Sequence, residues 1–242
     1  MRNARVYCPG NISVGESLRL SATASHHLIR VLRYKVKTAV TVFNGKGGEY
    51  SAVLLDENPK ATQLGVHDYT DINRASPLKI NLLQGISRGE HMDTTIQKTT
   101  EAGIDEIIPV ICERSASIKS SRVGKKLERW HQIAISACEQ CGRNLLPSVH
   151  RATPFDQAIY DDTSACKLVL DPAATEGIKT LGPYAGTVSI LCGPEGGLSD
   201  REIDAACNAG FKRISFGPRI LRTETAGAAF VTALQVIWGD MG

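Results

Sequence analysis

The sequence predicts a chain of two parts, a small β-barrel over residues 1–74 and an α/β domain over residues 75–242. Up to about Asn73, short β-branched runs are separated by turn residues, which is the pattern of a small all-β domain. Beyond Pro77, short apolar runs alternate with stretches of helical period. This alternation predicts a doubly wound, mostly parallel sheet. The segment RASP, residues 74–77, separates the two patterns and gives the boundary.

The first part carries five predicted strands and one short helix. Asn44 and Gly45 lie between two strand patterns and predict a hairpin, because this pair suits the turn that joins antiparallel strands. Residues 25–33 have the period of a short helix. The strands are predicted at residues 5–7, 17–22, 39–43, 50–55 and 62–69.

The second part carries six predicted strands and five predicted helices. In the helix at 122–141, apolar residues recur at helical spacing, so Trp130 is expected in the core and not as a platform for a base. The strands are predicted at 78–86, 105–112, 148–151, 166–170, 187–192 and 212–216. The helices are predicted at 91–103, 122–141, 154–161, 199–209 and 224–238.

The last two strand, loop and helix units bring two glycine-bearing loops together. The strand at 187–192 is followed by GPEGG, and Ser199 with Glu202 forms an S-x-x-E capping box that starts a helix, which Gly210 ends. The next strand leads through Gly217 into the final helix. Because open α/β sheets bind ligands at the carboxyl ends of their strands, these two loops form the predicted ligand site.

The spacing of these loops does not fix the ligand. The chain contains neither G-x-x-x-x-G-K-[ST] nor a G-x-G-x-x-G that opens a helix, which disfavours a phosphate group. The segment GPEGG also fits a plain tight turn that feeds a helix, and this alternative stays open.

Composition narrows the class of protein. The chain has 242 residues, 42% of them hydrophobic, without an apolar run of the length that spans a bilayer, about 18 residues. The first ten residues lack the design of a secretory signal, so we expect a soluble cytoplasmic protein with no membrane partner. Seven cysteines, an odd number, favour reduced thiols. The six histidines show no metal-ligand spacing, so we expect no metal site and ordinary roles for nearly all of them.

The basic residues are unevenly distributed. The net charge is only +3, but residues 1–46 hold eight Lys or Arg and one acid, Glu16. Such an excess suits a polyanion such as RNA, whose binding releases counterions. An ordinary solvated face is the alternative.

Five segments, in this order along the chain, resemble a known family. They are HHLIRVLR (26–33), GISRGEHMDTTIQKTTEAGI (85–104), ACEQCGR (137–143), GPEGGLS (193–199) and FGPRILRTETA (216–226). The last two are similar to the C-terminal motifs of the SPOUT superfamily of RNA methyltransferases. Together the five resemble its ribosomal-RNA uridine-N3-methyltransferase family, the RsmE type, from Arg5 to the end of the chain.

The resemblance implies a fold and a function. It implies a trefoil-knotted SPOUT domain preceded by a PUA-like RNA-binding barrel, and a homodimer formed through the C-terminal domain. It also implies methylation of uridine N3 in small-subunit (16S) ribosomal RNA, in the decoding region and on the assembled small subunit, with S-adenosylmethionine as the methyl donor. The alternatives are a SPOUT methyltransferase acting on a ribose 2'-hydroxyl of transfer or ribosomal RNA, and an RNA-binding protein without catalysis.

The family motifs also imply site residues. Arg222 would stabilise the anion of the target base and Glu224 would take its proton, while helix capping is the simpler role for Thr223 and Thr225. Glu195 could also simply satisfy nearby backbone donors. Cofactor contacts are predicted for Leu170, Gly193, Glu195, Gly196, Gly197, Phe216, Gly217, Ile220, Leu221 and Thr223. RNA contacts are predicted for Arg5, Arg30, Arg33, Arg88 and Arg143.

Overall fold

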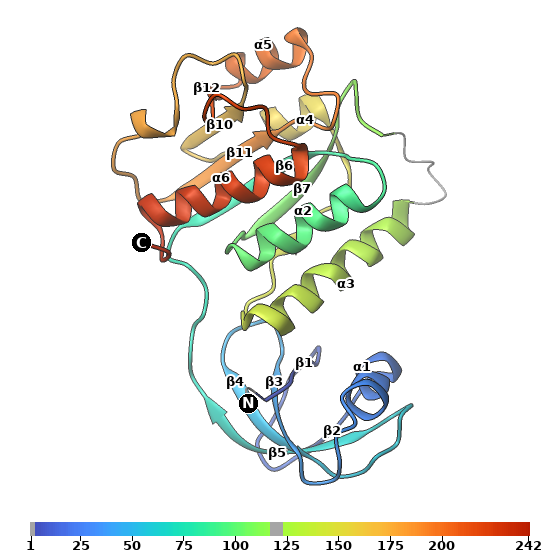
Figure 1. Ribbon diagram of the computed structural model, residues 1–242. Coiled ribbons are helices and arrows are strands. Elements are labelled where there is room, and N and C mark those ends of the chain that lie inside the picture. The colour runs from blue at the N-terminus through green and yellow to red at the C-terminus, as the bar shows by residue number, and fades with distance from the viewer. Residues whose placement is uncertain (1–2, 117–122) are drawn as a thin grey trace. The chain divides into compact units, whose positions relative to one another are not determined.

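The chain forms two compact units in the computed structural model, which describes residues 3–116 and 123–242 (Figure 1). The first unit comprises Met1–Ala75 and Cys138–Leu146, and the second comprises Ser76–Ala137 and Pro147–Gly242. The first unit therefore includes a return segment, Cys138–Leu146, that the sequence-based range of residues 1–74 does not contain. Arg2, counted above in the basic excess, and Arg122, the predicted start of a helix, lie outside the described residues.

The first unit is built on a five-stranded sheet in the order β1-β3-β4-β5-β2. The predicted hairpin at Asn44 is confirmed, since β3 and β4 pair antiparallel around Gly45, whose φ is +79°. The single helix predicted at 25–33 is instead a short α-helix, α1 (Ala22–His26), continued by one π-helical turn over His27–Val31. The strands are β1 (Arg5–Tyr7), β2 (Ser17–Arg19), β3 (Ala39–Phe43), β4 (Glu49–Leu54) and β5 (Gln63–Thr70).

The return segment is tied into the first unit by hydrogen bonds. The fully buried side chain of Asn144 accepts from the backbone N–H of Arg74 at 3.1 Å and donates to the carbonyl of Ile72 at 2.6 Å. The carboxylate of Glu139 accepts from the backbone N–H of Tyr7 at 2.9 Å. Residues far apart in sequence therefore complete one folding unit.

The second unit is built on a parallel sheet in the order β12-β10-β11-β6-β7-β8, with β9 also paired to β7. The strands are β6 (Lys79–Gly85), β7 (Glu106–Ile111), β8 (Ser148–Val149), β9 (Thr153–Pro154), β10 (Cys166–Leu170), β11 (Thr187–Cys192) and β12 (Lys212–Ile214). The helices are α2 (Glu90–Glu101), α3 (Val123–Cys141), α4 (Phe155–Tyr160), α5 (Asp200–Asn208) and α6 (Thr223–Trp238). The helix α3 ends in the return segment.

Helices cover both faces of this sheet. Neighbouring residues of a strand point to opposite faces, and β6 shows this with Leu82 in one core and Leu83 in the other. The first core is closed by α2, α3 and α6 and includes the predicted core residue Trp130. The second core is closed by α4 and α5 (Figure 1). The doubly wound sheet is therefore confirmed.

Three predicted strands end two or three residues earlier than expected: 17–22 is β2 (Ser17–Arg19), 148–151 is β8 (Ser148–Val149), and the third is β12. The sequence predicts a strand over 212–216, but β12 ends at Ile214. Ser215 leaves the sheet and forms an isolated bridge with Gly177, with its N–H donating to the carbonyl of Glu176 at 2.8 Å. The chain can therefore turn towards the cavity described below. Across residues 3–116 and 123–242, no helix is long and apolar enough to cross a membrane.

Candidate functional site

The candidate site is a cavity of about 870 Å³ at the carboxyl ends of β10, β11 and β12. Its walls come from the three loops that follow these strands and from the first turns of α2, α5 and α6. All twelve residues predicted for catalysis or cofactor binding line it. They are Leu170, Gly193, Glu195, Gly196, Gly197, Phe216, Gly217, Ile220, Leu221, Arg222, Thr223 and Glu224.

The loop after β11 is a tight turn that only small residues fit. A Cβ on Gly193 would lie 2.9 Å from the backbone nitrogen of Leu198, closer than real Cβ atoms come to other atoms. Gly197 has a φ of +70°, a left-handed conformation that side chains disfavour, and its N–H donates to the carbonyl of Pro194 at 2.9 Å. The segment GPEGG is therefore a tight turn, as one of the two predicted alternatives had it, and it also forms one wall of the cavity.

Neighbouring segments hold this loop in place. The guanidinium group of Arg114 donates to the carbonyl of Gly196 at 2.9 Å and to that of Leu198 at 3.2 Å. The carboxylate of Glu195 accepts from the backbone N–H of Arg88 at 2.7 Å, so its expected role of satisfying a backbone donor is confirmed. These hydrogen bonds of Arg114 and Glu195 fix the glycine loop as a rim of the cavity.

The capping box that follows the loop is confirmed. The hydroxyl of Ser199 accepts from the N–H of Glu202 at 3.2 Å, and the carboxylate of Glu202 accepts from the N–H of Ser199 at 2.9 Å. The helix α5 begins here, and Gly210, with a φ of +90°, follows its end. Both ends of α5 are therefore set by local sequence signals.

Thr223 joins the two loops and does not cap α6, so the capping role expected for it is wrong. The N-cap of α6 is Arg222, which makes no side-chain capping bond. The buried hydroxyl of Thr223 donates to the carbonyl of Gly193 at 2.6 Å and accepts from the amide of Gln84 at 2.9 Å. Burial raises the pKa of the neighbouring Cys192 thiol to about 11, against the opposing hydrogen bonds of Thr223 and Gln84, so this thiol stays protonated and structural.

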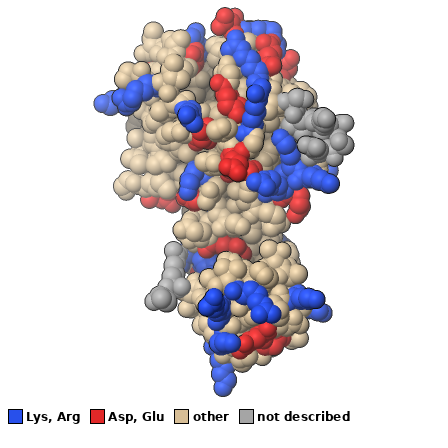
Figure 2. All heavy atoms as spheres, turned by 45° about the vertical axis from the view of Figure 1, so that its right-hand side comes forward, with Lys and Arg blue, Asp and Glu red and all other residues tan. Residues whose placement is uncertain are grey.

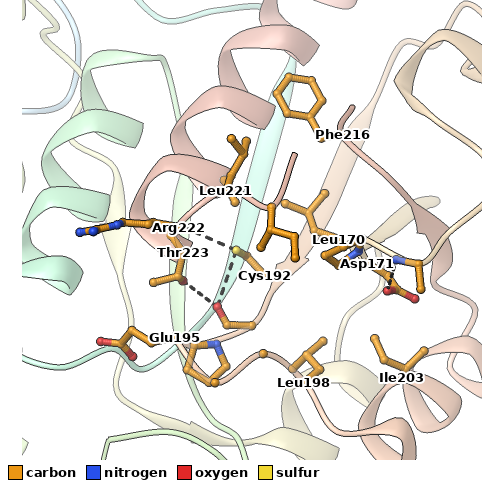
Figure 3. A pocket seen from close by; sticks show the side chains of 18 of the residues that line it. Leu170, Asp171, Cys192, Glu195, Leu198, Ile203, Phe216, Leu221, Arg222 and Thr223 are labelled. Atoms are coloured by element: carbon orange, nitrogen blue, oxygen red, sulfur yellow. Dashed lines mark hydrogen bonds between the residues drawn. The ribbon is translucent and has the colours of Figure 1, made fainter. Parts of the chain in front are cut away.

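The lining of the cavity contains both apolar and charged side chains. Figure 3 shows Glu195 and Arg222 on one side of the view, and Leu198, Ile203 and Leu170 with Asp171 on the other. Phe216 is anchored by an edge-on contact with Phe230 of α6, with ring centroids 5.5 Å apart. Ile220 is 83% exposed and lies at the rim. This arrangement suits a small molecule with an apolar part and a charged part.

Five carboxylates and three arginines are among the residues that line the cavity. They are Asp171, Glu195, Asp200, Asp204 and Glu224, with Arg213, Arg219 and Arg222. Asp171 is already paired, because its carboxylate accepts from Arg213 at 2.6 Å. Glu224 lies 3.2 Å from Nδ1 of His91, which belongs to the first turn of α2. The carboxylates that remain favour a ligand with positive charge.

The five arginines predicted to contact RNA have different environments. Arg30 and Arg33 of the first unit and Arg88 of the second are exposed. The side chain of Arg5 is 5% exposed, lies over the ring of Phe43 and donates to Glu49 at 2.9 Å.

Arg143 is also buried, at 7% exposure. Burial withholds Arg5 and Arg143 from a ligand at the surface of the first unit, so the structure corrects the prediction for these two. We assign them to the stability of that unit.

Other exposed basic residues accompany Arg30 and Arg33. Figure 2 shows one face on which Lys and Arg side chains gather over the first unit. The exposed basic residues of its described part are Arg19, Arg30, Arg33, Lys35, Lys37, Lys46, Lys60 and Arg74. No cluster of three or more His, Cys, Asp or Glu side chains suited to a metal ion occurs within 3–116 and 123–242.

Several residues of the cavity were not predicted from the sequence. Leu198 and Ile203 belong to the turn and helix after the glycine loop, and their closeness to that loop is the signal that could have found them. Asp171 directly follows the predicted Leu170. His91 lies in the family segment 85–104, but its place at the cavity depends on β6 lying next to β11, and the order of strands is not written in a periodic pattern.

Two family models match the chain. An RNA methyltransferase domain matches residues 74–235, which include every residue that lines the cavity. An RNA methyltransferase PUA domain matches residues 20–66, within the first unit.

The chain is also similar to a curated protein and to two solved structures. It is 35% identical to the ribosomal RNA small subunit methyltransferase E of Buchnera aphidicola, over 99% of this chain and 98% of that protein. A methyltransferase of Legionella pneumophila, solved with bound S-adenosylmethionine, has a TM-score of 0.96 and 38% identity over 99% of this chain and 100% of that one. A ribosomal RNA small subunit methyltransferase E of Neisseria gonorrhoeae, also bound to S-adenosylmethionine, has a TM-score of 0.92 and 36% identity over the whole of both chains.

Proposed function

Because this chain belongs to the ribosomal RNA small subunit methyltransferase E family, we propose that it methylates N3 of a uridine in small-subunit (16S) ribosomal RNA. The predicted resemblance and the predicted fold class, a SPOUT-type α/β domain after a small β domain, are both confirmed. One observation carries the proposal: the twelve site residues chosen from the family motifs line a single cavity.

The cofactor is S-adenosylmethionine, and the cavity fits it. The glycine loop forms one wall of the cavity, and Gly193 keeps it in a turn that a Cβ, 2.9 Å from the backbone nitrogen of Leu198, would not allow. Leu170, Phe216 and Leu221 offer apolar contacts for an adenine ring, and the carboxylates of Asp200 and Asp204, which line the same cavity, suit the ammonium and sulfonium charges. When bound, the cofactor supplies the methyl group as an electrophile that needs no metal.

The side chains around the cavity must then prepare the nucleophile. The N3 atom of uridine carries a proton at neutral pH, and this proton has to leave before N3 can attack. Arg222, at the N-terminus of α6, is placed to stabilise negative charge on the oxygens beside N3 with its planar guanidinium group. The proton leaves towards the part of the cavity that holds Glu224.

The exposed basic residues of the first unit support RNA as the substrate. Their charges bind a phosphate backbone through counterion release, without reading sequence. We place Arg30 and Arg33 in this contact, and Arg88, which precedes α2, closer to the reacting base. The decoding region of the assembled small subunit is our proposed target, in the cytoplasm.

We further propose a homodimer formed through the second unit. On the last helix and the residues after it, Val236, Ile237 and Met241 are 50%, 46% and 45% exposed. Burial of this apolar surface would favour association. Light scattering of the purified protein tests it, and a monomer at micromolar concentration would contradict it.

Mass spectrometry of ribosomal RNA nucleosides tests the proposed reaction. Small-subunit RNA from cells with the gene should contain N3-methyluridine, and RNA from cells without it should lack that nucleoside. Purified protein should restore the modification on small subunits in vitro. A ribose-methylated nucleoside that depends on the gene would favour the 2'-hydroxyl reaction, and no difference between the two RNAs would favour RNA binding without catalysis.

A further inference from the structure

One pair of side chains that line the cavity joins two helices. His91 is the second residue of α2, and Glu224 is the second residue of α6. These two helices are packed neighbours on one face of the sheet (Figure 1). Nδ1 of His91 lies 3.2 Å from Oε1 of Glu224, and both residues line the cavity.

The two side chains differ in exposure. The side chain of Glu224 is 14% exposed and that of His91 is 43% exposed. The imidazole is thus the more exposed of the two groups.

The pairing decides which nitrogen of His91 can accept a proton. A carboxylate only 3.2 Å from Nδ1 favours the tautomer that carries its hydrogen on Nδ1 and its lone pair on Nε2. Within residues 3–116 and 123–242, Nε2 has no hydrogen-bond partner, so that lone pair is available. Imidazole as a chemical class suits proton transfer near neutral pH better than a carboxylate does.

We propose that His91 removes the N3 proton of the target uracil and that Glu224 acts through His91 as a positioning residue, which rests on the proposed function above. The N3–H bond breaks and its proton moves to Nε2. The electron pair stays on N3 and forms the new bond to the methyl carbon, while the pair of the broken C–S bond stays on sulfur. The imidazole gains a positive charge, which the carboxylate of Glu224 stabilises.

Other charged groups act on the same ring. From the loops and from α6, Glu195, Arg219 and Arg222 share the cavity with it. On α2 itself, Glu90 and Asp93 lie in the same first turn, and Asp93 is already paired with Arg129. Glu224 is the group in direct contact with the ring, so its loss should change the pH profile most.

The structure offers a matched control. His150 pairs with Glu106 at 2.9 Å, and its side chain is 46% exposed, close to the 43% of His91. This second pair lies in the same unit but does not line the cavity of about 870 Å³. If the pair of His91 and Glu224 only held two elements together, substitution of His91 should affect the methylation rate no more than substitution of His150.

Single-turnover methylation of small subunits by His91→Asn, followed against pH, tests the proposal. Near neutral pH we expect a rate about a hundredfold below that of the unchanged protein. The gap should narrow about tenfold per pH unit as uridine loses its proton unaided. Free imidazole should partly restore His91→Gly. Cofactor affinity of both variants should be unchanged, and His150→Asn should keep the full rate.

Three results would overturn the proposal. The first is a full rate for His91→Asn at neutral pH. The second is the same fractional loss of rate for His91→Asn at every pH, without rescue of His91→Gly by imidazole. That result would show that His91 only holds α2 and α6 together. The third is the absence of N3-methyluridine from the product of the unchanged protein, and only this one also removes the proposed function.

Discussion

At the scale of single residues, Arg222 is distinguished by its position. It caps the N-terminus of α6, its side chain is exposed, and Figure 3 shows it beside the cavity on the same side as Glu195. Thr223, the next residue, is buried and bonded to the glycine loop. The backbone at this point is therefore fixed while the guanidinium group remains free to meet a substrate.

We expect Arg222→Ala to lower the single-turnover rate about a hundredfold, because it removes a donor to the developing anion. In contrast to His91→Asn, the rate should not recover as pH rises, since the anion still needs stabilisation after the proton has left. Arg222→Lys should recover only part of the rate because a lysine lacks the planar fork. Equal rates for Arg222→Ala and the unchanged protein would show that Arg222 is a surface residue without a role in the reaction.

A second residue-scale prediction concerns Glu49 of the first unit. Its side chain is 13% exposed and accepts from Arg5 at 2.9 Å and from Arg74 at 2.7 Å. Burial alone would raise the pKa of Glu49, but the hydrogen bonds and charges of Arg74 and Arg5 outweigh it and hold the pKa below 4.5. The charged carboxylate therefore stabilises the folded state above pH 4.5, and this contribution is lost as pH falls further.

Urea unfolding at several pH values checks this. Glu49→Gln should reduce the free energy of unfolding at pH 7, with the difference from the unchanged protein shrinking below pH 4.5. Glu57→Gln is the control, because the pair of Glu57 with Lys35 is exposed and screened by solvent. If the effect of Glu49→Gln were the same at pH 7 and pH 3, the carboxylate charge would not be its cause.

At the scale of elements, the loop after β11 should tolerate no added methyl group at Gly193. Its Cβ would meet the backbone nitrogen of Leu198 at 2.9 Å, and a backbone cannot swing aside as a long side chain can. We expect Gly193→Ala to weaken S-adenosylmethionine binding at least tenfold, measured by isothermal titration. The unchanged protein should bind the cofactor equally well with a chelator present.

Gly182→Ala is the matched control, since a Cβ there meets nothing within 4 Å. It should bind the cofactor as the unchanged protein does. Normal binding by Gly193→Ala would show that cofactor binding does not depend on this conformation of the loop.

Sequence patterns predicted most elements of this fold but not their arrangement. The box of Ser199 and Glu202 set the start of α5, and the run at 187–192 set β11, because caps and apolar periods are local. The bridge between Ser215 and Gly177, and the contact between His91 and Glu224, join segments distant in sequence. The knot implied by the resemblance is likewise invisible to periodicity, since a chain crossing leaves no local pattern.

The prediction of the site divides in the same way. The glycine loop and the segment 216–225 could be found because each is one continuous run of residues. For the arginines, the residue type does not tell whether the side chain is buried. Arg5 was therefore predicted to contact RNA, although its side chain is buried and paired with Glu49. Long basic side chains are mostly exposed, and only the fold shows which of them are exceptions.

At the scale of the whole molecule, the exposed basic residues should control RNA affinity and not cofactor affinity. We expect the double variant Arg30→Ala, Arg33→Ala to bind small-subunit RNA more weakly. The slope of log affinity against log salt should flatten by about one unit per lost phosphate contact. Filter binding at several salt concentrations measures this, and cofactor titration is the control. Normal affinity with an unaltered slope would show that these arginines only form a solvated surface and do not contact RNA.

The return segment limits how the first unit can be exchanged between genes by recombination or by engineering. The first unit is completed by residues 138–146, and Asn144 within them supplies bonds to Arg74 and Ile72. A gene fragment that ends at the boundary near residue 75 would encode strands that lack part of their own interior. The first unit is thus not a module that recombination can pass on in one piece. An exchange with another enzyme would have to carry two separate stretches of the gene at once.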